Sequence, residues 1–174
     1  MKKNYKKIGI LGGTFDPPHI GHLHISKIAI KKLKLNDLVW AIAKNNPLKK
    51  KPILNTKIRI RLSKKITKNY KKIYIKCFDK KKYESTYDLL KTIKKKNKKN
   101  QIFFLIGADN LIKFHKWKKW KKIPELAKIV VFARENYLKK AINSVAAKKL
   151  KKRDWIYINN KKINISSSLI RKFW

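Results

Sequence analysis

Short apolar runs alternate along the chain with longer segments in which apolar residues recur at every third or fourth position. A short apolar run predicts a buried β-strand, whereas the wider spacing predicts a helix with one apolar face. Six strands are therefore expected, at Lys6–Leu11, Leu38–Ala43, Ile73–Phe78, Gln101–Ile106, Lys128–Ala133 and Trp155–Ile158.

Helical segments are expected between these strands. His22–Leu33 has helical spacing, Thr56 is placed to cap the next helix, and STYDLLKTI begins with capping residues. A further helix is expected near Lys139–Leu150, and Ser166–Ser168 opens a short last one. This alternation predicts an α/β fold: a doubly wound, mostly parallel sheet with helices on both faces, in a single domain over residues 1–174.

Two of the predicted strands are followed by glycine and polar residues, in GGTFDPPHIGH and GADN. Ligands of such sheets bind beyond the carboxyl ends of the strands. We expect Gly12 and Gly13 to let the backbone approach an anion and to adopt dihedrals that other residues avoid. His19 and His22 are three residues apart, so in a first helical turn both imidazoles can point the same way and hold phosphate, with Gly21 leaving room for the ligand. A bound polyphosphate would favour their charged form.

Two other interpretations of the histidines stay open. His19, His22 and His24 could bind a metal ion, although no cysteine or glutamate lies nearby in the sequence, or the histidines could belong to the core. Neither interpretation explains the glycines and prolines around them, and we expect no metal ligands among the protein's own side chains.

The charge changes this picture little. The formal net charge is +40, but only five of the 49 basic residues are arginine, and lysine occurs in nearly every segment. Lysine, isoleucine and asparagine share AT-rich codons, so a biased genome explains their abundance without a specific nucleic-acid partner. Polyanion or nucleic-acid binding stays the alternative from a different functional class, and it would weaken steeply with salt.

No feature indicates export or a membrane. The apolar runs are shorter than the roughly 18 residues that cross a bilayer, and the N-terminal MKKNYKKIGILGG lacks a signal h-region. The one cysteine, Cys77, cannot form an internal disulfide. We expect a cytoplasmic protein without a membrane partner, as a monomer or a homo-oligomer.

Two motifs carry a resemblance to a known superfamily. GGTFDPPHIGH resembles the G-x-F-x-P-x-H-x-G-H signature of the nucleotidyltransferases, and ISSSLIRK resembles their I-S-S-T-x-I-R signature. The stretch FFLIGADNLIKFHKWKKWKKIPELAKIVVFAREN is similar to the central segment of bacterial nicotinate-nucleotide adenylyltransferases, and NNPLKK resembles the substrate loop of one branch. The resemblance implies a Rossmann-like fold, Mg²⁺ as cofactor, and adenylyl transfer from ATP to nicotinate mononucleotide with release of pyrophosphate.

The resemblance also implies roles for individual residues at the ATP site. His19, His22 and Arg171 would contact the triphosphate as catalytic groups, with His22 acting on the transition state. The other expected ATP contacts are Gly12, Gly13, Thr14, Phe15, Gly107, Asp109, Ser167 and Ser168.

The mononucleotide would lie beside Asn46, Lys49, Thr86 and Trp117, with the Trp117 ring stacked on the pyridine. Lys118 stands where relatives often have a second aromatic residue, and ESTYDLLKTI keeps the residue types of the family's S-Y-T-x-D-T-L but not their order. A helix cap is the alternative role for Thr86. A related enzyme that acts on nicotinamide mononucleotide or pantetheine phosphate, or a cytidylyltransferase, stays the alternative within the superfamily.

Overall fold

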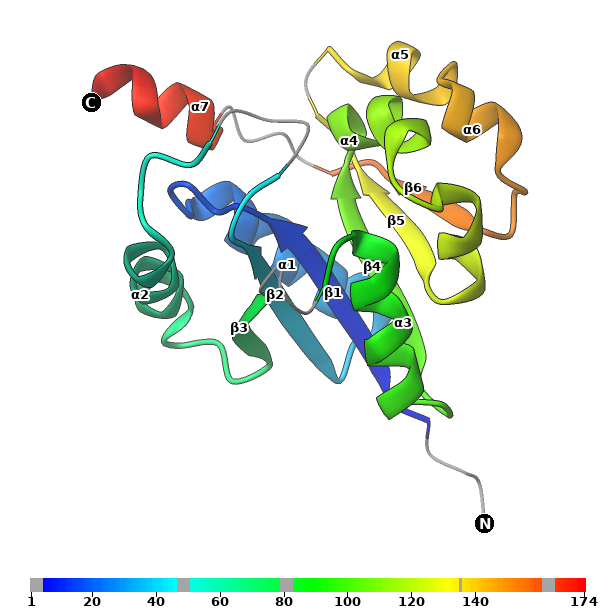
Figure 1. The fold of residues 1–174 in the computed structure, drawn as a ribbon, viewed down its shortest axis with the longest axis horizontal. Helices are drawn as coiled ribbons and strands as arrows, with labels where there is room; N and C mark the ends of the chain where they lie inside the picture. Colours follow the sequence, from blue (N-terminus) through cyan, green and yellow to red (C-terminus); the bar gives the residue numbers. More distant parts are fainter. Residues whose placement is uncertain (1–4, 47–50, 79–82, 135, 161–164) are drawn as a thin grey trace.

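The computed structural model describes residues 5–46, 51–78, 83–134, 136–160 and 165–174. All six expected strands are present, and they pair in parallel in one sheet of order β3-β2-β1-β4-β5-β6 (Figure 1). This is the strand order of a doubly wound sheet, so the predicted fold class is confirmed. The strands are β1 (Lys7–Gly13), β2 (Asp37–Ala43), β3 (Ile73–Phe78), β4 (Gln101–Gly107), β5 (Lys128–Phe132) and β6 (Trp155–Ile158).

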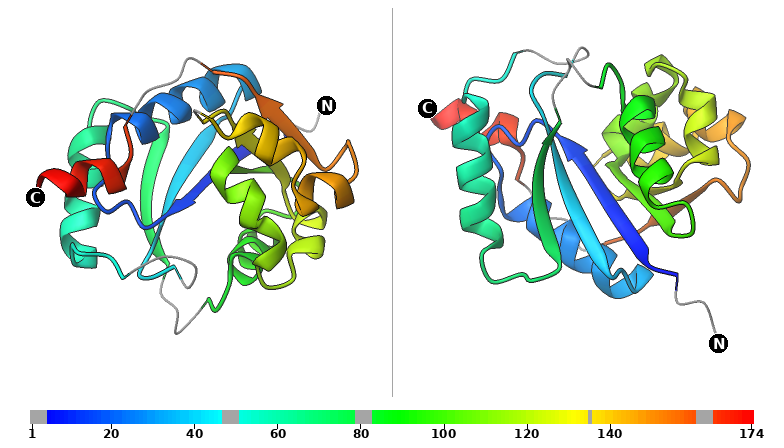
Figure 2. Two further views of the ribbon diagram at one scale, coloured as in Figure 1. Left: turned by 90° about the horizontal axis from the view of Figure 1, so that it is seen from above. Right: turned by 60° about the horizontal axis from the view of Figure 1, so that its bottom comes forward.

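Helices cover both faces of this sheet (Figure 2). Within the described residues, no helix is both long and apolar enough to span a bilayer. The α-helices are α1 (Ile20–Leu33), α2 (Thr56–Thr67), α3 (Thr86–Lys96), α4 (Ala108–Lys113), α5 (Leu138–Ile142), α6 (Val145–Lys149) and α7 (Ser167–Ile170). Short 3₁₀ turns occupy Phe114–Lys116, Trp120–Glu125 and Arg171–Phe173.

Two apolar layers hold the helices to the sheet. Alternate residues of β4 face opposite sides: Phe103 and Leu105 pack with the apolar residues of α1 and α2, whereas Phe104 and Ile106 pack with those of α3 and α4. A strand covered on both faces has an apolar residue at almost every position. This burial explains why the predicted strand bounds, taken from the apolar runs, agree closely with the observed ones.

Two helix predictions need correction. Asn55, not Thr56, caps α2, because its Oδ1 accepts the N–H of Ile58 at 2.9 Å. The helix predicted near Lys139–Leu150 is divided into α5 and α6, because Ser144 caps a second helix there. The helix α4, which follows β4 directly, was not predicted.

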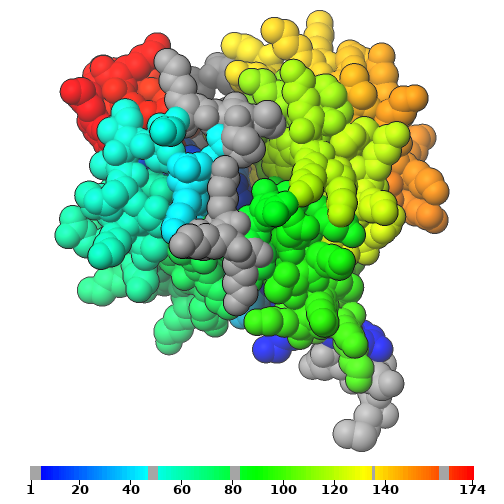
Figure 3. All heavy atoms as spheres, in the orientation of Figure 1, coloured from blue at the N-terminus to red at the C-terminus, as the bar shows by residue number. Residues whose placement is uncertain are grey.

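The carboxyl ends of β1 and β4 lie side by side in the centre of the sheet, with Leu11 opposite Leu105. They mark the point at which the strand order reverses, which is the usual ligand position in such sheets. The segments GGTFDPPHIGH and GADN therefore meet at one edge. In the space-filling view (Figure 3), the C-terminal residues (red) and the α5–α6 segment (yellow to orange) stand on opposite sides of that edge.

Candidate active site

His19 and His22 stand together at the start of α1. His19 precedes the helix with extended backbone, and its Nδ1 accepts the N–H of Gly21 at 3.1 Å. The Nδ1 of His22 accepts the N–H of His19 at 3.2 Å. This reciprocal capping brings the two ring centres within 3.9 Å of each other. The first turn of α1 therefore holds both imidazoles side by side, as their spacing predicts.

These hydrogen bonds also fix the position of the ring protons. A ring nitrogen that accepts a backbone N–H bond carries no proton, so each neutral imidazole has its proton on Nε2. Burial lowers the pKa of His19 from 6.5 to about 4, and the positive charge of Arg134 adds to the effect. Unliganded His19 is thus neutral at pH 7, and it can still donate from Nε2. A hydrogen bond to phosphate does not require the charged imidazole expected from the sequence.

Gly12 and Gly13 do not adopt the unusual dihedrals that the sequence led us to expect. None of the chain's glycines has a positive φ, and the residue with φ of 51° in this turn is Phe15. A Cβ at Gly12 would lie 3.4 Å from the Phe104 ring, and a Cβ at Gly13 would lie 3.4 Å from the Phe15 ring. The predicted dihedrals are therefore wrong. Both Cβ distances are ordinary van der Waals contacts, so the Phe104 and Phe15 rings lie directly beside the two glycines.

The C-terminal segment that contains Ile165 and Ser167 packs against the turn between β1 and α1. A Cβ at Gly21 would lie 2.9 Å from the His19 ring and 3.1 Å from Ile165. Protein atoms occupy the space that was expected to receive a ligand, so that prediction is wrong. The Ser167 hydroxyl donates to the carbonyl of Pro17 at 2.8 Å. The two motifs, from opposite ends of the chain, thus meet at one edge of the sheet.

Arg171 adds a second set of contacts between the C-terminal motif and the first motif, through Asp16. Its Nη1 donates to the backbone carbonyl of Asp16 and lies 3.5 Å from the Oδ2 of that residue, while Nη2 donates to Ser168 Oγ at 3.2 Å. The buried Asp16 carboxylate also accepts the N–H groups of Ile53 and Leu54, both at 2.9 Å. One carboxylate therefore joins the first turn, the segment before α2 and the C-terminal arginine.

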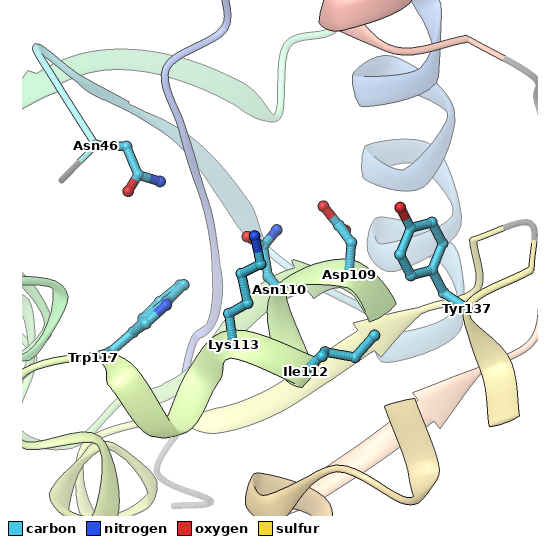
Figure 4. A pocket seen from close by; sticks show the side chains of 7 residues that line it. All are labelled: Asn46, Asp109, Asn110, Ile112, Lys113, Trp117 and Tyr137. Atoms are coloured by element: carbon cyan, nitrogen blue, oxygen red, sulfur yellow. The ribbon is translucent and has the colours of Figure 1, made fainter. Parts of the chain in front are cut away.

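A hollow of about 160 Å³ opens at the same edge (Figure 4). Figure 4 shows Asn46 and Trp117 at one end of it and Asp109 and Tyr137 at the other. The lining residues are Asn46, Asp109, Asn110, Ile112, Lys113, Trp117 and Tyr137. Residues expected at the mononucleotide (Asn46, Trp117) and at ATP (Asp109) therefore line one continuous space.

Comparison with known proteins decides the family. Residues 10–173 match the family described as Cytidylyltransferase-like. The chain belongs to this family. It is 47% identical over 173 residues to a probable nicotinate-nucleotide adenylyltransferase of Pelagibacter ubique, with 99% of this chain and 96% of the relative covered. A probable nicotinate-nucleotide adenylyltransferase of Clostridium perfringens is 36% identical, with 96% and 85% covered.

Solved structures agree with this assignment to the nucleotidyltransferases. The Plasmodium falciparum nicotinic acid mononucleotide adenylyltransferase complexed with NaAD superposes with a TM-score of 0.80 at 25% identity, covering 97% of this chain and 84% of the other. The same parasite enzyme complexed with APC gives a TM-score of 0.75 at 26% identity, with the same coverage. This nucleotidyltransferase therefore shares both its fold and most of its length with these adenylyltransferases.

Asp109 has one paired and one unpaired carboxylate oxygen. Its Oδ2 lies 3.3 Å from Nη1 of Arg134. Its Oδ1 is buried and has no hydrogen-bond partner among the described residues. A buried acceptor without a donor is unfavourable, and a sugar hydroxyl would supply that donor. Arg134, which was not predicted as a site residue, thus pairs with Asp109, and its charge adds to the lowering of the His19 pKa by burial.

Arg59 is a second arginine that sequence reasoning missed. It is only 1% exposed, and burial lowers its pKa while the charge of Asp16 opposes that shift. Its guanidinium donates to four backbone carbonyls, those of Thr14, Ala43, Lys44 and Leu54. Arg59 therefore holds the turn after β1 against the end of β2, which leads to Asn46. The one sequence feature that could have drawn attention to Arg59 is that arginine is rare in this chain, which has only five.

The described residues do not place two of the predicted mononucleotide contacts, Lys49 and Thr86, at the hollow. Lys49 lies outside the described residues. Thr86 is the first residue of α3 and is not among the residues that line the hollow. The capping role considered for it belongs to Ser85, whose Oγ accepts a backbone N–H of the helix. Lys118, in the place of the second aromatic residue, pairs with Glu84 at 2.6 Å.

Proposed function

We propose that this nucleotidyltransferase transfers the adenylyl group of ATP to nicotinate mononucleotide, forming nicotinate adenine dinucleotide and pyrophosphate. The observation that carries the proposal is the meeting of the two motifs at the edge of the sheet where the hollow opens, with Arg171 and Ser167 bonded to the turn that precedes His19. The names of the relatives, which are nicotinate-nucleotide adenylyltransferases, support the choice of substrates.

The chemistry needs positioning more than proton transfer. The attacking phosphate of the mononucleotide is already anionic, so no general base is required. The protein must align two polyanions and stabilise the charge that develops on pyrophosphate. His19 and His22 would donate from Nε2 to the triphosphate, and the Arg171 guanidinium would carry the compensating charge. The backbone of Gly12, Gly13, Thr14, Phe15 and Ser167 and the Ser168 hydroxyl complete the proposed phosphate contacts.

Residues that line the hollow supply part of the proposed contacts for the two nucleosides. Trp117 lines the hollow, and its ring packs at a tilt against Phe114 with centres 5.0 Å apart. In the proposed complex it would stack on the pyridine. Asn46 and Lys49 would bind the mononucleotide phosphate, and Thr86 would contact the nicotinate ring. At the other end, the unpaired Oδ1 of Asp109 and the backbone of Gly107 would bind the ATP ribose.

Mg²⁺ is proposed to enter with ATP. The described residues include no group of three histidine, cysteine or carboxylate side chains that could hold a metal ion. Asp16 and Asp109 each pair with an arginine, whose positive charge disfavours a metal ion beside them. This donor set fits an ion held mainly by phosphate oxygens, which is a common arrangement for Mg²⁺. When bound, the ion neutralises phosphate charge.

The test is a pyrophosphate-release assay with ATP, Mg²⁺ and each acceptor in turn: nicotinate mononucleotide, nicotinamide mononucleotide and pantetheine phosphate. A further arm replaces ATP with CTP. We expect the highest kcat/KM with ATP and nicotinate mononucleotide. A higher value for another pair of substrates would overturn the proposed specificity, and no activity with any pair would overturn the proposed reaction.

We further propose that the enzyme works in the cytoplasm, as a monomer or homo-oligomer, without a specific nucleic-acid partner. Polyanion binding through the lysines would disappear at high salt, because it depends on counterion release. Binding of nicotinate mononucleotide should persist at 0.5 M salt. Nucleic-acid binding that outlasts mononucleotide binding at this salt would favour the other functional class.

A further inference from the structure

The His22 imidazole packs against two buried aromatic side chains, Phe15 and Trp40. Trp40 of β2 is completely buried, and its ring stacks on that of Phe15 with centres 4.9 Å and planes 16° apart. The His22 ring centre lies 4.7 Å from that of Phe15 and 5.9 Å from that of Trp40. The two aromatic rings form a wall that limits the movement of the imidazole.

The same indole is connected to the main chain of His22. Nε1 of Trp40 donates to Ser26 Oγ at 2.8 Å, and Ser26 Oγ donates to the carbonyl of His22 at 2.7 Å. A serine hydroxyl has one proton to donate and can accept as well, so Ser26 makes both bonds at once. Trp40 therefore touches the His22 side chain directly and reaches its backbone through one hydroxyl.

We infer that Trp40 and Ser26 are positioning residues, which orient the His22 imidazole for adenylyl transfer. Both are completely buried, so neither can contact a substrate. A donor that stabilises transition-state charge must be placed accurately, because small displacements reduce the rate strongly. The inference rests on the proposed role of His22 in the transfer reaction.

The test replaces Ser26, with a matched control on another helix. Ser26→Ala removes both hydrogen bonds. Ser63→Ala is the control, since Ser63 of α2 is also completely buried, yet its Oγ has no hydrogen-bond partner among the described residues. We expect kcat to fall about 10- to 100-fold in Ser26→Ala, with KM for ATP within about twofold of wild type. Ser63→Ala should keep the wild-type kcat, and Ser26→Thr, which retains the hydroxyl, should recover part of the loss.

A second variant covers the case in which Ser26→Ala fails to fold. Trp40→Phe removes the indole donor and leaves the bond from Ser26 to His22 intact, so no buried donor loses its acceptor. It should lower kcat in the same direction with KM for ATP little changed. A lower melting temperature with unchanged kcat, in either variant, would show a purely structural role and overturn the inference.

A spectroscopic measurement separates this inference from the proposed function. The Cε1–H resonance of His22 should be shifted or broadened in Ser26→Ala and unchanged in Ser63→Ala. If the wild type releases no pyrophosphate, the proposed function fails, and the resonance still decides whether Ser26 orients the ring. An unperturbed His22 resonance in Ser26→Ala would overturn the inference.

Discussion

Acid should destabilise this protein through the buried side chain of His19. Burial, with a smaller contribution from Arg134, lowers the His19 pKa from 6.5 to about 4 in the folded chain. Between these two values the unfolded state binds more protons than the folded state, so the free energy of unfolding falls as the pH falls. The stability held by neutral His19 is therefore complete above pH 6.5 and is lost progressively towards pH 4.

The size of this effect follows from the interval between the two pKa values. One pH unit corresponds to about 1.4 kcal/mol, so the interval from 6.5 to about 4 gives a loss of about 3 kcal/mol below both values. At pH 5 the expected loss is about 2 kcal/mol. Solvent screening reduces it little, because His19 is only 6% exposed.

Urea unfolding at pH 8 and pH 5, for wild type and His19→Asn, measures this contribution. Asparagine is a good helix cap but does not titrate. The other titrating groups are common to both proteins and cancel in the comparison. We expect wild type to lose about 2 kcal/mol more than His19→Asn between the two pH values. Equal losses would refute the assignment of a buried neutral imidazole.

Four other substitutions test the site and its frame. His22→Ala should lower kcat by about 10²- to 10³-fold in the pyrophosphate assay, because a donor to the transition state is lost; near-normal turnover would remove its proposed role. Arg171→Lys should lower kcat/KM for ATP at least about tenfold, because an ammonium cannot reproduce the guanidinium fork, and unchanged kinetics would contradict this. Trp117→Ala should raise KM for nicotinate mononucleotide about tenfold, but not KM for ATP, through lost stacking; equal changes in both would argue against stacking. Arg59→Met should lower the urea-derived free energy of unfolding by about 3 kcal/mol, because buried carbonyls lose their donor, and wild-type stability would show that they find others.

The fold was predictable because the central strands β4 and β5 are buried at nearly every position. Burial on both sides makes a strand apolar at almost every position, and Gln101–Gly107 of β4 shows this most clearly. α4 escaped prediction because it has only six residues and begins immediately after β4. A helical period needs a longer window before it is visible in a sequence.

The parts of the candidate site that depend on a local sequence pattern were predictable. The three-residue spacing of His19 and His22 correctly predicted that their rings lie side by side. The part played by Gly21 depends on Ile165, which is distant in the chain, so no local pattern could reveal it.

Arginine was the signal that could have revealed more of the site. Lysine is abundant everywhere in this chain, yet Arg59, Arg134 and Arg171 are three of only five arginines, and all three lie at this edge of the sheet. Arg59 and Arg171 each bond several acceptors, which a lysine cannot do with the same geometry. In a chain where lysine is so abundant, each arginine is a candidate for a position that needs the guanidinium.

The central claim is that groups from both ends of the chain bind one triphosphate. The most direct test is a crystal structure of the protein with a non-hydrolysable ATP analogue. The account predicts Nε2 of His19, Nε2 of His22 and the Arg171 guanidinium all within about 2.7–3.2 Å of oxygens of the same triphosphate. A triphosphate bound away from the His19–His22 turn, or contacted by the histidines while Arg171 faces only Asp16, would contradict it.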